Sequence, residues 1–159
     1  MDMTLALLFA ATIFIGLLSG ASLDQSIKQL PSRHRIGATA YSQYSRASDL
    51  GNGILFYAIL GVAAALLNIA AAIAAYLQRI PSQLSNLIYV GALLAVLHSL
   101  ATTQAAPLNF SQRKTSPNDE HGLAVVFDKF ARWQTIRCIL QVLNFGVNLW
   151  ALVVYLRAG

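Results

Sequence analysis

One stretch, residues 133–156, constrains the fold of this chain more than any other feature. It reads WQTIRCILQVLNFGVNLWALVVYL. At a rise of about 1.5 Å per residue, some ~20 mostly apolar residues cover the ~30 Å hydrocarbon core of a membrane, so this stretch is long enough to cross one. Its polar residues Arg137, Gln141, Asn144 and Asn148 nevertheless share one helix face. Lipid cannot solvate that face, so we expect it to point at other helices or into an enclosed cavity.

Three further apolar stretches complete the pattern. The predicted spans are residues 4–23, 52–76, 84–105 and 133–156. The 159 residues are 57% hydrophobic and only 11% charged, and the mean hydropathy is +0.58. The sequence therefore predicts one transmembrane domain over residues 1–159, an all-α integral membrane antiparallel four-helix bundle. The first span is expected to be a retained helix rather than a signal peptide, because no Lys or Arg precedes it.

Composition excludes several functional classes. Cys138 is the single cysteine, so neither an intramolecular disulfide nor a CxxC redox pair can form. The formal charge of +5 comes from basic residues beside the apolar spans, which favours anionic membrane lipids over nucleic acid as partners. No metal site is predicted, because His34, His98 and His121 each lack a second ligand three or four residues away.

The distribution of basic residues predicts an orientation. Four spans place the two long connections on one side and both termini, with the short turn at Arg79 and Pro81, on the other. The long connections hold Lys28, Arg33, Arg35, Arg46, Arg113, Lys114, Lys129 and Arg132, whereas the opposite side holds Arg79 and Arg157. The positive-inside rule then puts the long connections in the cytoplasm, and a plasma membrane is the default location.

The two long connections carry secondary predictions. Tyr41 and Tyr44 lie on one side of an expected interfacial helix, where tyrosines ordinarily anchor at headgroup level. The segment 122–132 has the spacing of a short amphipathic helix of its own. Pro107, followed by Asn109, is expected to end the third span.

Three motifs resemble one membrane family. They are DLGNGILFY at residues 49–57, APLN at residues 106–109, and W-x-x-x-R at residues 133–137 followed by LQVLNFGVNLWAL. The chain is similar in these places, and in its number of spans, to the anthrone oxygenase-like membrane family. The resemblance implies oxidation of an anthrone by molecular oxygen, with neither metal nor flavin as cofactor.

The spans offer residues for such chemistry. A cofactor-free oxygenase needs a base, donors that stabilise an anion, and a pocket that excludes water. His98 is the only imidazole within a span and is the predicted base, with Arg137 as its catalytic partner. The predicted substrate-binding residues, which supply donors or flat apolar surfaces, are Asn52, Tyr57, Asn109, Trp133, Gln141 and Asn144.

Each of these residues also has a structural explanation. Arg137 can contact lipid headgroups or pair with Asp49, and His98 can bond a neighbouring helix. Asn68, with the polar residues of the fourth span, can link helices. The alternative function is a non-catalytic subunit of a larger assembly with partner membrane subunits. Gly16 and Gly20 favour it, because their spacing allows close helix approach.

Overall fold

The chain is helical along almost its whole length. A computed structural model describes residues 2–158, and no β-strand occurs among them. The elements are α1 (Met3–Asp24), η1 (Gln25–Gln29), α2 (Leu30–Ile36), α3 (Ala38–Ala47), η2 (Ser48–Asn52), α4 (Gly53–Leu77), α5 (Ser82–Ser111) and α6 (Glu120–Ala158), where η denotes a π-helical turn. Four continuous stretches are long and apolar enough to cross a membrane, namely Met3–Ile36, Ala38–Leu77, Ser82–Ser111 and Glu120–Arg157. The prediction of an all-α chain with four long apolar helices is confirmed.

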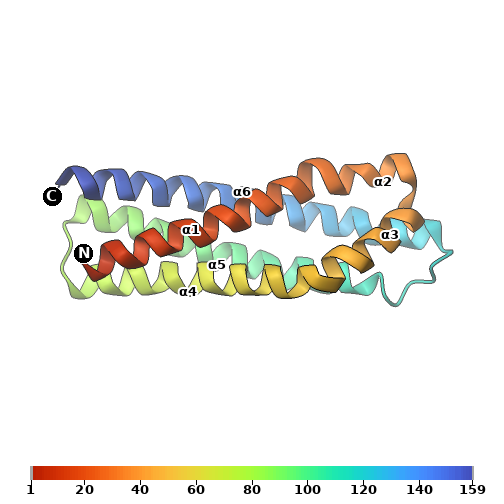
Figure 1. Cartoon of the computed structure of the whole chain (residues 1–159), viewed down its shortest axis with the longest axis horizontal. Helices are drawn as coiled ribbons and strands as arrows, with labels where there is room; N and C mark the ends of the chain where they lie inside the picture. The colour runs from red at the N-terminus through yellow and green to blue at the C-terminus, as the bar shows by residue number, and fades with distance from the viewer. Residues whose placement is uncertain (1, 159) are drawn as a thin grey trace.

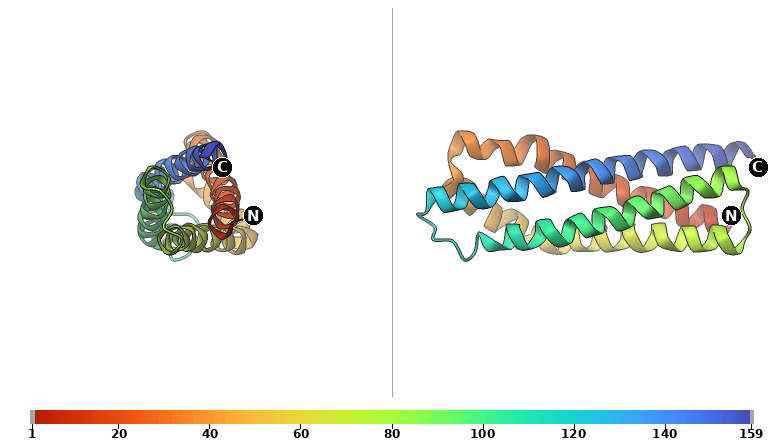
Figure 2. Two further views of the ribbon diagram at one scale, coloured as in Figure 1. Left: turned by 90° about the vertical axis from the view of Figure 1, so that its left-hand side faces the viewer. Right: turned by 180° about the vertical axis from the view of Figure 1, so that it is seen from behind.

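The four stretches lie side by side around a common axis, as the end-on view in Figure 2 shows. α1 packs against α4 and α6, and α5 packs against the same two helices. Both termini and the turn between α4 and α5 lie at the same end of the molecule, as Figure 1 shows. We call this the terminal end. The α2–α3 hairpin and the connection 112–119 lie at the opposite, hairpin end.

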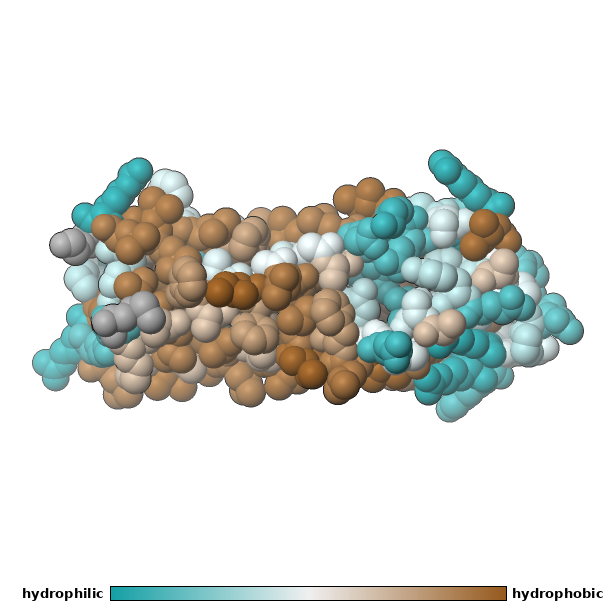
Figure 3. Space-filling view, viewed as in Figure 1, coloured by the Kyte–Doolittle hydropathy of each residue, from teal (hydrophilic) through white to brown (hydrophobic). Residues whose placement is uncertain are grey.

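Each stretch is longer than a membrane requires. The stretches have 30 to 40 residues, or about 45–60 Å against a hydrocarbon core of ~30 Å. Figure 3 shows a hydrophobic surface over the part nearer the terminal end and a hydrophilic surface over the hairpin end. The predicted spans therefore end before the helices do, and the helices continue into a polar extension.

Two predicted helix ends are wrong. α5 continues through Pro107 to Ser111 instead of stopping there. A proline removes one backbone hydrogen bond, and α5 withstands that loss because Ala105 and Leu108 on either side pack into an apolar cluster. The segment 122–132 is not a separate helix either. It forms the first turns of α6, because no glycine or proline occurs from residue 123 to the start of the fourth predicted span at residue 133.

The α2–α3 hairpin builds its own core. Tyr41 is fully buried and packs edge-on against Phe127 of α6, with 4.8 Å between ring centroids. Leu30, Leu123 and Phe130 belong to the same cluster. Tyr41 is therefore a core residue and not the predicted headgroup anchor, whereas Tyr44 is exposed.

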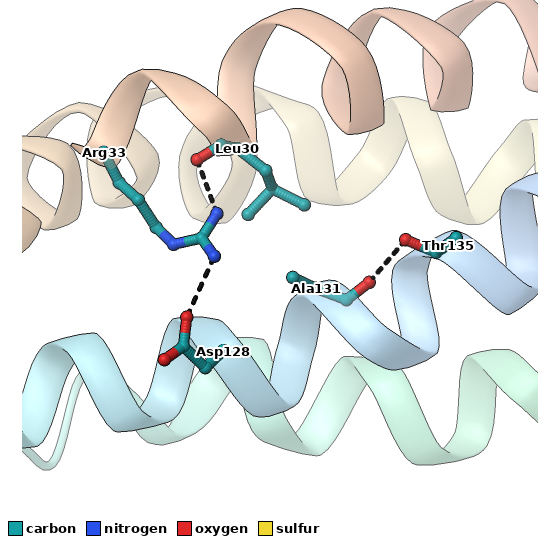
Figure 4. A network of polar contacts seen from close by, with 5 residues as sticks. All are labelled: Leu30, Arg33, Asp128, Ala131 and Thr135. Carbon is teal, nitrogen blue, oxygen red and sulfur yellow. Dashed lines mark hydrogen bonds and ion pairs between the residues drawn. The ribbon is translucent and has the colours of Figure 1, made fainter. Parts of the chain in front are cut away.

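Polar contacts fasten this hairpin to α6. Arg33 donates to the carbonyl of Leu30 at 2.7 Å and pairs with Asp128 at 2.9 Å, as Figure 4 shows. The Glu120 carboxylate accepts hydrogen bonds from the backbone N–H groups of Ala38 and Thr39 at the start of α3. Side chains of α6 thus bind both α2 and the start of α3.

Gly16 and Gly20 have different surroundings. A Cβ on Gly16 would lie 2.8 Å from the Phe145 ring of α6, whereas a Cβ on Gly20 would meet nothing within 4 Å. Gly16 therefore allows the close contact between α1 and Phe145 of α6, whereas the space beside Gly20 is open.

Candidate functional site

The polar face predicted for the fourth span points inward. Gln141, Asn144 and Asn148 are buried between the helices, and so is Gln134 one turn before Arg137. On the facing helix α5, Gly91, Ala95 and His98 are buried as well. Polar groups therefore line the contact between α5 and α6, which we call the seam, while the outward-facing side chains of the same turns are apolar.

A cavity of about 210 Å³ lies along this seam toward the hairpin end. Its apolar wall includes Leu18, which belongs to an apolar cluster between α1 and α4, and Phe130, which belongs to the core of the α2–α3 hairpin. The cavity therefore lies where these two parts of the core meet. Its polar lining residues are Gln25, Asp49, Tyr57, His98, Thr102, Asn109, Arg137 and Gln141.

The structure brings together five of the eight predicted site residues. His98, Arg137, Tyr57, Asn109 and Gln141 all line this cavity. The two residues predicted to act in catalysis thus line the same cavity, a relation that periodicity within single helices cannot reveal.

The other three predicted residues lie elsewhere. Asn52 is exposed in η2. Trp133 is 36% exposed and lines an outer groove with Leu97 and Ile136. Asn144 is buried but does not line the cavity. Asn52 and Trp133 both project from the outer side of their helices.

Arg137 is held by a relay of side chains. Its Nη2 donates to Gln25 Oε1 at 3.3 Å, and Gln25 Nε2 donates to Asp49 Oδ2 at 3.1 Å. Ser45 Oγ donates to the same carboxylate oxygen at 3.1 Å. Gln25 therefore bridges Arg137 and Asp49, whose direct pairing was one of the structural explanations considered for Arg137. The bridge connects α6 through η1 to η2.

His98 is the least satisfied polar group in the cavity. The side chain is 2% exposed, and neither ring nitrogen has a hydrogen-bond partner among residues 2–158. Arg137 Nε and Gln141 Oε1 are also buried without partners in the described part of the chain. Leaving a buried polar atom unpaired costs about 1–3 kcal/mol, so these groups favour a polar ligand in the cavity.

Both π-helical turns contribute to the site. Gln25 begins η1, and Asp49 and Leu50 lie in η2; all three line the cavity. A π turn changes the direction in which side chains project, and such turns recur at functional sites. A Cβ on Gly53 would lie 2.8 Å from the Ser48 carbonyl, so the backbone needs glycine to leave η2. Gln25 was not among the predicted site residues, because it lies past residue 23, where the first predicted span ends.

A second polar cluster lies deeper along the seam. Asn148 Nδ2 donates to Asn68 Oδ1 at 3.0 Å and so links α6 to α4, as expected of interhelical amides. The amide oxygens of Asn68, Asn144 and Asn148 gather around Gly91. Any side chain at Gly91 would displace them.

The remaining histidines are not part of a site. His34 and His121 are exposed at the hairpin end. Across residues 2–158, no three His, Cys, Asp or Glu side chains group closely enough to hold a metal ion.

Comparison with protein-family models, with curated proteins and with solved structures finds no match to this chain. The anthrone oxygenase-like resemblance therefore stays a prediction, and the functional assignment depends on the cavity's own geometry and chemistry.

Proposed function

We propose that this chain is an integral membrane protein whose cavity binds a lipophilic aromatic molecule with an acidic C–H or O–H group and oxidises it. In this proposal the helices cross the bilayer as an antiparallel bundle with the hairpin end in the cytoplasm. The apolar surface in Figure 3 supports the insertion. The excess of Lys and Arg at the hairpin end supports the orientation.

The observation that carries the proposal is that His98 and Arg137 line the same cavity. An unpartnered imidazole is a proton acceptor, and a guanidinium stabilises the negative charge that deprotonation creates. Phenylalanines and aliphatic residues form the rest of the wall, so an aromatic body is the best match for the space between them.

Cavity size limits the aromatic body. A volume of about 210 Å³ exceeds the ~150 Å³ that accommodates one benzene and lies below the ~300–1,000 Å³ of usual drug-sized sites. Two or three fused rings are therefore the expected scale, and an anthrone falls within it.

The oxidation can be written in balanced steps. His98 removes one proton from the central CH₂ carbon of an anthrone, and Arg137 stabilises the resulting oxyanion. Molecular oxygen takes one electron from the carbanion and then bonds to that carbon, which gives a peroxide anion. The imidazolium returns its proton to the peroxide. Loss of water then breaks the O–O bond and the second C–H bond, so the products are an anthraquinone and water.

Oxygen uptake tests this proposal. Wild-type protein in lipid nanodiscs is expected to consume oxygen with anthrone, and His98→Ala to lose about 100-fold or more of that rate, since general-base catalysis contributes ~10²–10⁴. His98→Gln keeps a hydrogen-bonding amide but cannot take the proton, and should fail equally. His34→Ala is the matched control, because His34 is exposed and remote from the cavity. Undiminished turnover in both His98 variants would remove this residue from the mechanism.

A second candidate is a non-catalytic subunit of a larger membrane assembly. The observation that favours it is Gly20, which is exposed on α1 with open space beside its Cα. Native mass spectrometry of protein extracted with its own lipids distinguishes the two. A partner chain that is lost on Gly20→Leu supports the subunit, and a solitary chain or homo-oligomer supports the enzyme.

A further inference from the structure

The wall of the cavity is closed on one side and open on the other. The lining residues from α1 and α6 are mostly buried, as Leu18, Phe130 and Gln141 show. Those that reach the surface come from α4 and α5, where Ile54 is 37% and Phe110 is 40% exposed. The cavity therefore opens between α4 and α5.

Small residues line this opening. Ala58 and Gly61 on α4 and Ala106 on α5 all border the cavity. A Cβ on Gly61 would meet nothing within 4 Å, so the space beside it is free. Because these side chains are small, they leave space beside the cavity on this side.

The most exposed side chains at the opening are apolar, and a cation lies at its hairpin end. Arg113 lies with its guanidinium carbon 5.5 Å from the centre of the Phe110 ring and donates to the Leu50 carbonyl at 2.7 Å. Arg113 thus marks the hairpin end of the opening. Farther along the opening, Ile54, Ala58 and Ala106 are apolar and suit contact with lipid tails, and Tyr57, Thr102 and Asn109 are the partly buried polar residues of the same two helices.

We infer that the cavity holds only the aromatic head of its substrate, whose hydrocarbon tail passes between α4 and α5 into the bilayer. This inference depends on the proposed function, and it assigns the substrate to tail-bearing phenols or related aromatics dissolved in the membrane. The acidic group of the head lies against Arg137 and His98. The enclosed volume limits the size of the head, and the opening leaves the length of the tail free.

Two phenols of different tail length test the inference. Binding of para-ethylphenol and para-decylphenol is measured on wild-type protein in nanodiscs, with each concentration expressed as the mole fraction in the lipid. This unit corrects for the stronger partitioning of the decyl compound into lipid. The two dissociation constants are then expected to agree within about threefold, because the tail remains in lipid when the phenol is bound. A closed cavity would accept the ethyl compound and reject the decyl compound.

Gly61→Leu places a side chain in the opening. It is expected to weaken decylphenol binding by about tenfold and ethylphenol binding by less than about threefold. Gly146→Leu is the matched control, since a Cβ there also meets nothing within 4 Å and Gly146 does not line the cavity.

The outcomes separate the two proposals. If neither phenol binds wild-type protein, the proposed function fails and this inference with it. If ethylphenol binds and decylphenol does not, only the inference about the tail is overturned. Equal decylphenol binding by Gly61→Leu and Gly146→Leu would overturn the placement of the tail between α4 and α5.

Discussion

His98 and Arg137 bring two complementary groups to one apolar space. Arg137 is tethered by Gln25, whereas His98 has no partner in the described chain and is free to accept a proton. A fixed cation beside a free base is the arrangement that proton abstraction from a weak acid requires. The proposed function therefore predicts that substitutions of the two residues have separable effects, on binding for Arg137 and on turnover for His98.

Arg137→Met should weaken binding of an acidic phenol such as pentachlorophenol by roughly 10- to 150-fold. The reason is that hydrogen bonds to charged groups contribute about 1.5–3 kcal/mol. Methionine keeps similar length and apolar contact while removing the charge. Tryptophan fluorescence quenching in nanodiscs measures the affinity. Arg132→Met, which alters an exposed arginine one turn away, should leave it unchanged; equal losses in both variants would rule out a specific role for Arg137.

Gly91→Ala is expected to destabilise the protein by about 1–3 kcal/mol, the usual cost of overpacking a core. The added Cβ would lie 2.5 Å from Asn148 Oδ1, in a buried cluster whose amides also bond one another. Gly146→Ala adds the same methyl group to open space and should be close to neutral. Unfolding in mixed micelles compares the two variants, and a neutral Gly91→Ala would show that the asparagine cluster is loosely packed.

Single residues were predictable where helix periodicity decides which side is buried. The inward positions of His98, Gln141, Asn144 and Asn148 follow from that rule. Gln25 could not be found in the same way, because its direction depends on a π turn that has no sequence signature. Trp133 shows the opposite error, since its flat ring at the start of the fourth span made it a predicted site residue while its helix face points outward.

At the scale of elements, the α2–α3 hairpin lies next to the hairpin end of the cavity, although no residue of α2 or α3 lines it. It is attached through η1 and η2, the same turns that supply Gln25 and Asp49. Gly37 at its tip adopts a φ of 86°, which favours glycine, and Glu120 caps the helix that follows. The tip therefore depends on one carboxylate from α6.

Glu120→Ala should open the hairpin locally. Loss of a helix cap costs about 0.5–2 kcal/mol, so trypsin cleavage after Arg35 is expected to accelerate by roughly two- to thirtyfold. His121→Ala changes the adjacent exposed residue and provides the control. Cleavage rates are followed by mass spectrometry of the fragments, and identical rates in both variants would mean that the cap does not hold the tip.

Element boundaries were the weakest part of the sequence prediction. Hydropathy locates the part of a helix that lipid would surround. The stretch Met3–Ile36 nevertheless continues past residue 23 through η1 and α2, and α6 begins at Glu120, well before residue 133; the apolar cluster between the α2–α3 hairpin and α6 stabilises both polar extensions. The predicted helix end at Pro107 was wrong for a related reason, since the packing of residues on both sides of Pro107 outweighs one missing backbone hydrogen bond.

For the whole molecule, the charge distribution predicts that the hairpin end faces the cytoplasm. The native cysteine, Cys138, is buried, and Cys138→Ala provides a background for single-cysteine labelling. Ser116→Cys should react with a membrane-impermeant maleimide only in inverted vesicles, and Gln83→Cys only in intact cells. Both positions are exposed, at opposite ends of the molecule. The reverse pattern would invert the orientation and place the cavity near the other membrane face.

The central claim is that a membrane-dissolved aromatic molecule occupies the cavity between the helices. Photoaffinity labelling in nanodiscs with a tail-bearing phenol that carries a diazirine on its ring tests it most directly, with the adducts mapped by mass spectrometry. The account predicts adducts on cavity residues such as Tyr57, Thr102 and Ala106, suppressed by excess unlabelled phenol and reduced in Arg137→Met. Adducts concentrated on the outer groove at Trp133 and Leu97, or labelling that excess phenol does not suppress, would contradict it.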